Sequence, residues 1–270
     1  MKNSIIRDAA VAAVALISVA ASAQAQTYRV TVENLAPANG TFLTPVWFGF
    51  NNGTFDIYNM GEAASEALER IAEDGTVGPI GTAFQNSGAG TVGGAIPGPM
   101  GAFAGPIDPG EIASVIVNLD PMAMSSRFFS YASMIIPSND AFIANGNPMA
   151  HQVFDDLGNF LGADFIILGS EVLDAGTEVN DESTTNTAFF GQAAPNTGTP
   201  ENGTVQIHPG FIPGGPILSD PNFANANFTQ PGYQIARITI TAAAPEPGTL
   251  GLALIGFAGL AGAGFRRIRR

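Results

Sequence analysis

The chain has 270 residues, of which 46% are hydrophobic and only 12% are charged, and it contains no cysteine. Its 23 acidic residues outnumber its 10 basic ones, and the net charge of −13 excludes a nucleic-acid binder, because neutralising phosphates requires clustered Lys and Arg. The lack of cysteine excludes a disulfide scaffold, an iron–sulfur centre, a cysteine nucleophile and a thiolate zinc site.

Residues 1–25 are predicted to form a signal peptide that is removed on export. Lys2 and Arg7 are the basic residues before an apolar run, Ala9–Ala21, and Ala23-Gln24-Ala25 has the small-x-small pattern of a cleavage site. The apolar run is shorter than the roughly 20 residues that span a bilayer. We therefore expect a signal-peptide helix here and a mature chain that begins at Gln26.

Residues 26–243 are predicted to form one β-rich domain. In its first segment Tyr28, Val30 and Val32 alternate with polar residues, as in a strand with one buried face. Residues that favour turns separate the later apolar segments. Further strands are expected at Val46–Phe50, Glu111–Leu119, Phe128–Ile136, Gln152–Phe154, Phe160–Ser170, Thr204–Ile207 and Tyr233–Thr241. This succession of strands predicts an antiparallel β-sandwich.

One short helix is predicted within this domain, at Glu62–Asp74, with Gly75 as its stop. Its apolar residues share one face, and its glutamates, Glu73 included, are expected on a solvated opposite face. Two stretches, Gln85–Pro109 and Thr177–Gly203, are expected to be long loops. The predicted fold class is therefore mainly β, an antiparallel sandwich with one short helix.

The sequence lacks the motifs of common enzyme classes, such as G-x-S-x-G, H-E-x-x-H and a P-loop. The two histidines, His151 and His208, have no partner at ligand spacing, so structural or surface roles are favoured. Residues 26–247 contain no lysine and only four arginines, which leaves few cations to stabilise an oxyanion. We therefore expect no enzymatic activity.

Carboxylates form the one pattern that suggests chemistry. Asp140 follows the apolar strand ending at Ile136, and Asp174 and Glu178 follow the strand Phe165–Leu173. If both strand ends lie on one rim, the three carboxylates converge, and a hard divalent ion would relieve their repulsion. Calcium suits oxygen ligands better than zinc does. The alternative is a pair of turns whose Asp side chains accept hydrogen bonds from backbone amides.

Three segments resemble the spondin N domain family. Tyr28–Leu35 resembles its opening strand, Met134–Phe142 its Met-Ile-x-Pro-Ser-x-Asp-x-Phe segment, and Asp174–Glu178 its Asp-Ala-Gly-Thr-acid segment. The resemblance covers about residues 27–242. It implies a sandwich related to C2 domains with a bound calcium ion.

Carrying that calcium site over residue by residue gives three ligands, Asp140, Asp174 and Glu178. Animal members have Asp at the position of Glu178 and Trp at the position of Ala141, so an animal-type partner surface is not implied. Asp155 and Asp156 are read as part of a hairpin turn outside the site.

Residues 244–270 have the three parts of a sorting and anchoring segment. Pro245-Glu246-Pro247 precedes the apolar run Gly248–Phe265, and the chain closes with arginines. The run is at the lower limit for a transmembrane helix, and the arginines would stay cytoplasmic. This order closely resembles the bacterial PEP-CTERM sorting signal, whose tail is processed by an exosortase in exopolysaccharide-producing envelopes. An ordinary tail anchor is the alternative.

Together these observations predict an exported protein in the cell envelope, at the surface or in the extracellular matrix of a Gram-negative bacterium. The leading hypothesis is a calcium-binding adhesion or extracellular-matrix-type module whose partner is a matrix protein or a polysaccharide. The alternative is a polysaccharide-binding module that uses Phe-rich loops and Trp47 as stacking platforms. A hydrolase that uses Asp140 and Glu178 as a carboxylate pair is a more distant third hypothesis.

The processing hypothesis makes a direct prediction for the protein recovered from its native host. We expect an N-terminus at Gln26 and a C-terminus close to Pro245-Glu246-Pro247, because both cleavage signals lie at those points. Mass spectrometry of the intact protein and its terminal peptides measures both. A mature chain that still ends at Arg270 would favour the ordinary tail anchor.

Overall fold

The computed structural model describes residues 25–99 and 105–243. The predicted signal-peptide helix and the predicted C-terminal transmembrane helix lie outside these residues. Within the described ranges the protein is mainly β, with two antiparallel sheets and a few short helices. None of the helices in this part of the chain has the length and apolar character needed to cross a membrane.

The smaller sheet confirms the alternating pattern of the first segment. Its strands lie in the order β5 (Ile112–Leu119), β1 (Gln26–Asn34), β12 (Gln234–Ala242) and β9 (Ala163–Leu168). Tyr28, Val30 and Val32 are buried, whereas Arg29 on the other face of β1 is exposed. This sheet has one face against the core and one toward solvent, so its strands alternate.

The larger sheet has a different burial pattern. Its path is β11 (Gln206–Ile207), β10 (Leu173–Asp174), β7 (Ala141–Ala144), β6 (Phe128–Ile136), β3 (Val46–Asn51) and β4 (Val92–Ile96), and both β2 (Phe42–Leu43) and β8 (His151–Gln152) pair with β6. All residues of β3 and nearly all of β6 are buried, because the sheet is covered on both faces.

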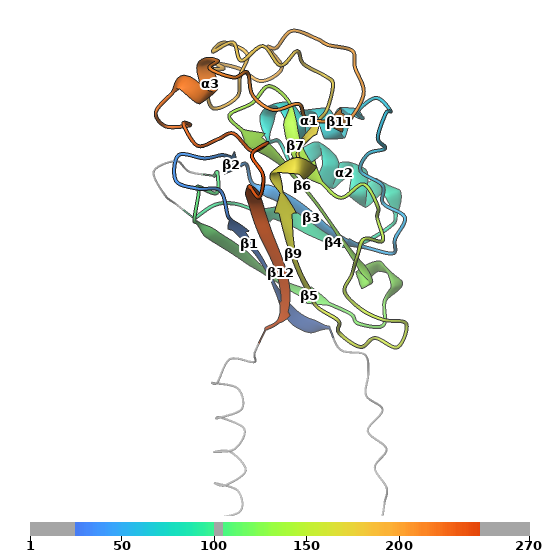
Figure 1. Cartoon of the computed structure of the whole chain (residues 1–270). Coiled ribbons are helices and arrows are strands. Elements are labelled where there is room, and N and C mark those ends of the chain that lie inside the picture. Colours follow the sequence, from blue (N-terminus) through green and yellow to red (C-terminus); the bar gives the residue numbers. More distant parts are fainter. Residues whose placement is uncertain (1–24, 100–104, 244–270) are drawn as a thin grey trace, which may run out of the picture.

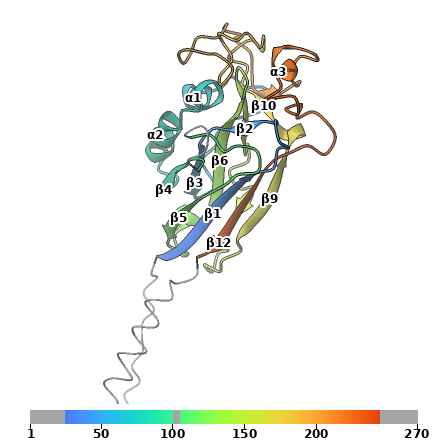
Figure 2. The same cartoon turned by 90° about the vertical axis from the view of Figure 1, so that its left-hand side faces the viewer.

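The two sheets enclose the main core, in which Val30 and Ile238 of the small sheet belong to the same cluster as Phe50 and Phe129 of the large one. The second face of the large sheet is covered by helices α1 (Glu66–Asp74) and α2 (Gly78–Ser87), as Figure 2 shows. The architecture is therefore sheet on sheet with a third, helical layer.

The expectation of a single helix is wrong, because α2 follows α1 after a short turn. Helix α1 begins where the Ser65 hydroxyl accepts a hydrogen bond from the Leu68 amide, and it ends at Gly75 in a left-handed conformation (φ 64°). The segment of α2 contains two glycines and a proline, which gives it weak helix propensity. It is helical because Ile80 and Phe84 pack against the sheet.

The predicted strand Phe165–Leu173, which precedes Asp174, is also wrong. Strand β9 ends at Leu168, a 3-10 turn (η2, Gly169–Glu171) follows, and β10 belongs to the other sheet. A Cβ on Gly169 would lie 1.9 Å from the Phe228 carbonyl oxygen, so the crossing between sheets needs glycine. The predicted loop Gln85–Pro109 likewise contains β4 and the end of α2.

The two ends of the domain lie side by side. Strands β1 and β12 pair along their length, and the Ala243 amide donates to the Thr27 carbonyl oxygen (2.9 Å). The 177–203 loop lies at the opposite end of the molecule, with α3 (Pro216–Ser219) close by (Figure 1). A short 3-10 turn, η1 (Met124–Ser126), precedes β6. The segments before and after the domain thus join it far from this loop.

The fluorescence of Trp47 reports on the packing of the helical layer, because Trp47 is the only tryptophan in the chain and is 1% exposed. Its ring packs against Phe55 and Phe84, which excludes it as an exposed stacking platform. We expect blue-shifted fluorescence that acrylamide quenches weakly and that shifts to the red on unfolding. Phe84→Ala should lower the free energy of unfolding by about 3–5 kcal/mol, because it leaves a cavity beside Trp47.

Urea unfolding followed by Trp47 fluorescence measures this loss. Leu157→Ala is the control: Leu157 is 77% exposed, so the change should stay within about 0.5 kcal/mol. Equal stability of the two variants would contradict the packing of the helical layer.

Candidate metal centre

The strand register places Asp140 and Asp174 side by side. Asp140 immediately precedes β7, and Asp174 at the end of β10 pairs with Ala141, the first residue of β7. The Ala175 amide also donates to the Asp140 carbonyl oxygen (3.2 Å). The two motifs that the sequence separates by more than thirty residues therefore meet at one end of the large sheet.

Asp140 is fully buried and holds the start of the following loop. Its Oδ2 accepts hydrogen bonds from the Thr177 amide (2.8 Å), the Thr177 hydroxyl (3.1 Å) and the Glu178 amide (3.1 Å). Its Oδ1 is buried without a hydrogen-bond partner. Burial and then the charge of Asp174 raise the pKa of Asp140 to about 7, against the lowering effect of these three hydrogen bonds.

Glu178 is the second buried carboxylate, 2% exposed. Its Oε1 accepts a hydrogen bond from the Gly198 amide (2.8 Å), and its Oε2 has no partner. A Cβ on Gly198 would lie 1.9 Å from the Glu178 carboxyl carbon, so a larger residue there would displace the Glu178 carboxylate. Burial raises the pKa of Glu178 to about 7, with further increases from the charges of Glu73, Asp140 and Asp74.

Asp174 is oriented by a chain of hydrogen bonds that ends at His208. Its Oδ1 accepts from the Gly176 amide (2.7 Å) and its Oδ2 from the Asn180 side-chain amide (2.9 Å). The His208 Nδ1 accepts from the Gly210 amide (3.0 Å), so in the neutral ring Nε2 carries the proton and donates to the Asn180 Oδ1 (3.1 Å). Burial lowers the pKa of His208 to about 4, which keeps it neutral.

Sequence reasoning favoured a structural or surface role for His208 without assigning its partner, and it did not single out Asn180. The spacing Asp174-x5-Asn180 is the only local signal for this arrangement, and the pairing with His208 depends on β11 lying beside β10. His151, the other histidine, stacks on Phe165 with ring centroids 3.7 Å apart. Burial lowers its pKa to about 4.

The end of α1 adds two more carboxylates to the cluster. Glu73 is 2% exposed, so the expectation that it faces solvent is wrong: the packing of α1 against the sheet and the loop covers the end of its polar face. Arg70 pairs with Glu69, Glu73 and Asp74. Burial is the largest cause of the raised pKa values of both Glu73 and Asp74.

The loop that follows Asp174 is tied at its base. The Gly203 amide donates to the Gly176 carbonyl oxygen (2.7 Å), Glu201 to Thr177 (2.9 Å) and Val179 to Thr199 (2.8 Å). Gly176 has a positive φ of 68°, and a Cβ there would lie 2.5 Å from the Thr204 nitrogen. The 177–203 segment is therefore a loop closed by backbone pairing, with Glu178 directed inward at its base.

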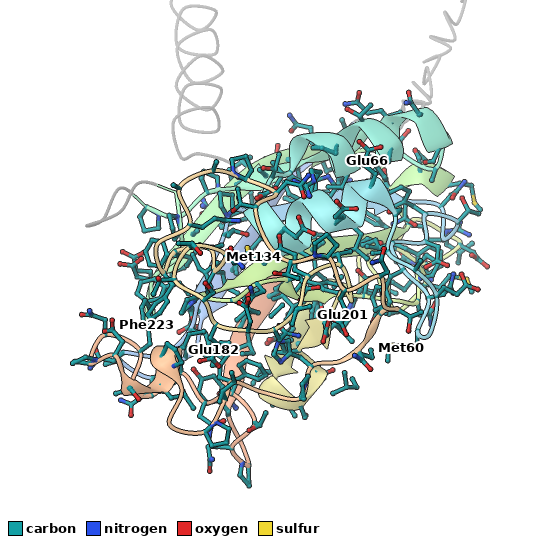
Figure 3. The ribbon with its side chains drawn as sticks, turned by 90° about the horizontal axis from the view of Figure 1, so that it is seen from above. Met60, Glu66, Met134, Glu182, Glu201 and Phe223 are labelled. Carbon is teal, nitrogen blue, oxygen red and sulfur yellow. The ribbon has the colours of Figure 1, made fainter. Side chains whose placement is uncertain are left out.

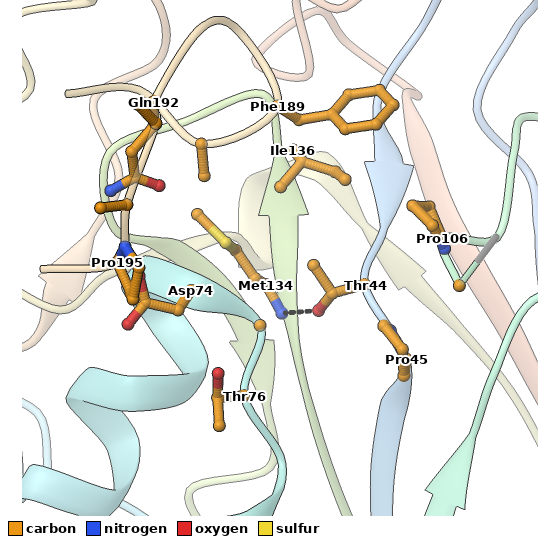
Figure 4. A pocket seen from close by; sticks show the side chains of 15 residues that line it. Thr44, Pro45, Asp74, Thr76, Pro106, Met134, Ile136, Phe189, Gln192 and Pro195 are labelled. Atoms are coloured by element: carbon orange, nitrogen blue, oxygen red, sulfur yellow. Dashed lines mark hydrogen bonds between the residues drawn. The ribbon is translucent and has the colours of Figure 1, made fainter. Parts of the chain in front are cut away.

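A cavity of about 500 Å³ lies beside this loop (Figure 4). Asp74 and Gln192 line it on one side, and Met134, whose amide donates to the Thr44 hydroxyl (3.1 Å), lines its centre. Asp155 and Asp156 do not line this cavity but lie in a hairpin turn, in which Asp155 Oδ1 accepts from the Leu157 and Asn159 amides. That turn matches the sequence prediction.

Some features of this carboxylate cluster fit a bound metal ion and one does not. Among the described residues no three His, Cys, Asp or Glu side chains meet closely enough to hold a metal by themselves. The two oxygens without partners, on Asp140 and Glu178, are what a hard cation would satisfy. Both oxygens of Asp174 already accept hydrogen bonds, but each carboxylate oxygen has a further lone pair.

The comparisons with known proteins concern the other end of the chain. Residues 243–270 match a family model described as the PEP-CTERM protein-sorting motif, which confirms the prediction made for 244–270. The protein is thus exported and sorted to the bacterial cell surface, and exosortase recognises the motif. No curated protein matches the chain.

The raised pKa values predict how the free energy of unfolding depends on pH when a chelator keeps metal ions from binding. Asp140 and Glu178, with ordinary values of 3.8 and 4.5, bind protons more tightly when folded. Their contribution to the free energy of unfolding is therefore fully present below about pH 4 and is lost as the pH rises through about 7. His151 and His208 have lowered pKa values and act in the opposite direction, but only below about 6.5.

Above pH 6.5 the carboxylates alone should govern the trend, so the melting temperature in EDTA should fall between pH 6.5 and 8. Asp140→Asn should flatten this slope because it removes one titrating group. Asp164→Asn is the control, since Asp164 is exposed and pairs with Arg237. A melting temperature that rises over this range would contradict the assignment.

Proposed function

We propose that this exported surface protein is a non-enzymatic, calcium-binding module of an adhesive or matrix type, similar to a spondin N domain. The observation that supports it is the pair of buried carboxylate oxygens without partners, Asp140 Oδ1 and Glu178 Oε2. A buried polar group without a hydrogen bond costs free energy, and a buried charge costs more. A cation would be a suitable partner for both oxygens.

Calcium suits these ligands because it binds oxygen and accepts irregular geometry. Asp140 and Glu178 would supply the oxygens without partners, and Asp174, already oriented by Asn180, would complete the proposed carboxylate set. Arg70 does not meet this need, because it forms ion pairs with Glu69, Glu73 and Asp74. When bound, the ion would supply positive charge and no redox or hydrolytic chemistry.

The proposed role of calcium is structural. Asp140 lies in the β6–β7 turn, Asp174 at the end of β10, and Glu178 at the base of the 177–203 loop. An ion shared by them would join two strands of the large sheet to the loop. Binding to the folded state alone would add about 2.7 kcal/mol of stability at a calcium concentration of 100 Kd.

The adhesive role is supported by where this end of the molecule lies. The joined ends of β1 and β12 lead toward the sorting tail, and the loop with the carboxylates is at the opposite end (Figure 1). A chain held by its tail would therefore present the loop outward, to a matrix protein or polysaccharide of the envelope. Exosortase processing near Pro245-Glu246-Pro247 would then release it from the membrane.

The calcium proposal is tested by thermal unfolding and titration calorimetry at pH 7.5. Millimolar calcium should raise the melting temperature of the wild-type protein by several degrees, because each kcal/mol shifts a domain of this size by about 2–4 °C. Asp140→Ala and Asp174→Ala should lose most of that increase.

Asp156→Ala is the matched control, since Asp156 is exposed in the hairpin turn and should leave the increase unchanged. Magnesium at the same concentration should have a smaller effect, because it requires stricter octahedral geometry. No heat of binding at millimolar calcium would refute the metal proposal, and an equal loss in Asp156→Ala would move the ion elsewhere.

A further inference from the structure

A second cavity, of about 840 Å³, lies beside α3. Four phenylalanines line it, together with acidic and amide side chains, and the lining residues come from four separate segments of the chain. The walls are tied to one another, because Asn225 donates from its amide to the Asn39 carbonyl oxygen (3.0 Å) and from its side chain to Ala38 (2.8 Å). A pocket of this size can enclose a small organic ligand.

The phenylalanines form one aromatic cluster around Phe223. Phe42, Phe189 and Phe190 have ring centroids 6.0, 6.4 and 6.0 Å from that of Phe223, and Phe42 and Phe189 are 5.3 Å apart. Phe223 is buried, whereas the other three are half-buried at the surface of the main core. Their exposed portions give the cavity an apolar, aromatic wall.

Two residues of the wall have backbone conformations that ordinary side chains rarely adopt. Phe189 has φ of 60° and Asn39 has φ of 59°. For a bulky residue such as Phe189 the left-handed region is strained, and strain of this kind is concentrated at functional sites. The fold thus holds an aromatic ring in this wall at a cost in backbone energy.

The charges around the cavity are all of one sign. Asp108 and Asp220 line it, and none of the described lining residues is Lys, Arg or His. The Oδ1 of Asp108 is buried without a hydrogen-bond partner, whereas Asp220 Oδ1 accepts from the Asn222 amide (2.8 Å). Burial and the charge of Glu111 raise the pKa of Asp108, as expected for a carboxylate without a cation.

We propose that this pocket binds an organic cation with an apolar body, such as an aromatic amine or the lysine or arginine side chain of another polypeptide. The ammonium or guanidinium group would meet Asp108 and Asp220, and the apolar body would lie against the phenylalanine rings. An anion is disfavoured, because residues 26–247 carry 22 acidic side chains and 4 basic ones. This site is separate from the proposed calcium ligands.

Figure 3, which looks down on the loop end, shows Phe223 and Glu182 together at α3, apart from Met134 nearer the centre of the molecule. The carboxylate of Glu182 accepts hydrogen bonds from the amides of Ile212 and Ile217 and so belongs to the scaffold beside the pocket. Asp108 and Asp220 are therefore the carboxylates on which the charge preference of the pocket depends.

The test compares three probes that share a phenyl ring: phenethylammonium, 2-phenylethanol and 3-phenylpropionate. The measurement is titration calorimetry on the full chain, held in detergent micelles at low salt, with the heat of titration into protein-free micelles subtracted. Phenethylammonium should have a Kd at least about tenfold lower than that of the alcohol. The carboxylate probe should bind more weakly than both. Raising the salt concentration should reduce the preference for the amine.

Asp108→Asn/Asp220→Asn keeps acceptor atoms but removes both charges, so it should abolish the preference of the amine over the alcohol. Asp120→Asn is the matched control, because Asp120 makes the same turn contact with the amide two residues on (2.9 Å) and lies outside the pocket. Phe190→Ala should weaken both the amine and the alcohol by about fivefold or more. Melting temperatures identify any variant that fails to fold. If the double variant fails, the weaker binding expected of Phe190→Ala tests whether the probes occupy this pocket, and the comparison of the three probes on the wild-type protein tests the charge preference.

An alcohol that binds as tightly as the amine would overturn the proposal in favour of an apolar pocket, and methyl glucoside binding more tightly than either would favour a sugar site. No binding of any probe, or an unchanged preference in the double variant, would also overturn it. A lysine-rich peptide that competes with the amine would identify a polypeptide as the source, and its failure to compete would identify a free amine. Asp140→Ala should bind the amine normally, so failure of the calcium proposal is distinguishable from failure of this one.

Discussion

Carboxylate burial is the constraint on which one end of this molecule depends. Glu73, Asp74, Asp140, Asp174 and Glu178 pack where α1, the β6–β7 turn, β10 and the 177–203 loop meet, and Arg70 is paired with the first two. Backbone amides stabilise one oxygen each of Asp140 and Glu178 and leave the other without a partner. The loop base is held by the same contacts, so its position and the charge of the cluster are physically coupled.

The layers of the fold explain why this end can carry such a cluster. The large sheet is buried on both faces, between the small sheet and the helices α1 and α2, so its strands are fixed by packing along their length. Polar chemistry is left to the turns that connect them. The β1 and β12 ends that lead to the sorting tail are at the other extremity, which leaves both the carboxylate cluster and the aromatic cavity at the end remote from the tail.

The candidate site could be predicted in its residues but not in its surroundings. Asp140, Asp174 and Glu178 follow apolar strands and precede turn residues, which is a local signal, and the structure does bring Asp140 and Asp174 together. The path of the chain to Asp174 differs from the predicted single strand, because β9 ends at Leu168 and β10 lies in the other sheet. Glu73 and His208 join the cluster only through pairings between distant segments, which no local pattern records, whereas Asn180 lies six residues from its partner Asp174.

The sequence by itself determined the mainly β class, the alternation of β1, the helix that ends at Gly75 and the PEP-CTERM sorting motif, because each depends on residues close together in the chain. That helix begins after Ser65 and not at the predicted Glu62. Tertiary structure decided the rest. Helix α2 forms from residues of weak propensity because its apolar side chains meet the sheet. Trp47 is buried because that layer covers it, and the four phenylalanines around Phe223 meet because packing joins four segments. Such contacts are set by burial across long sequence separations, and their energies exist only once the chain has folded.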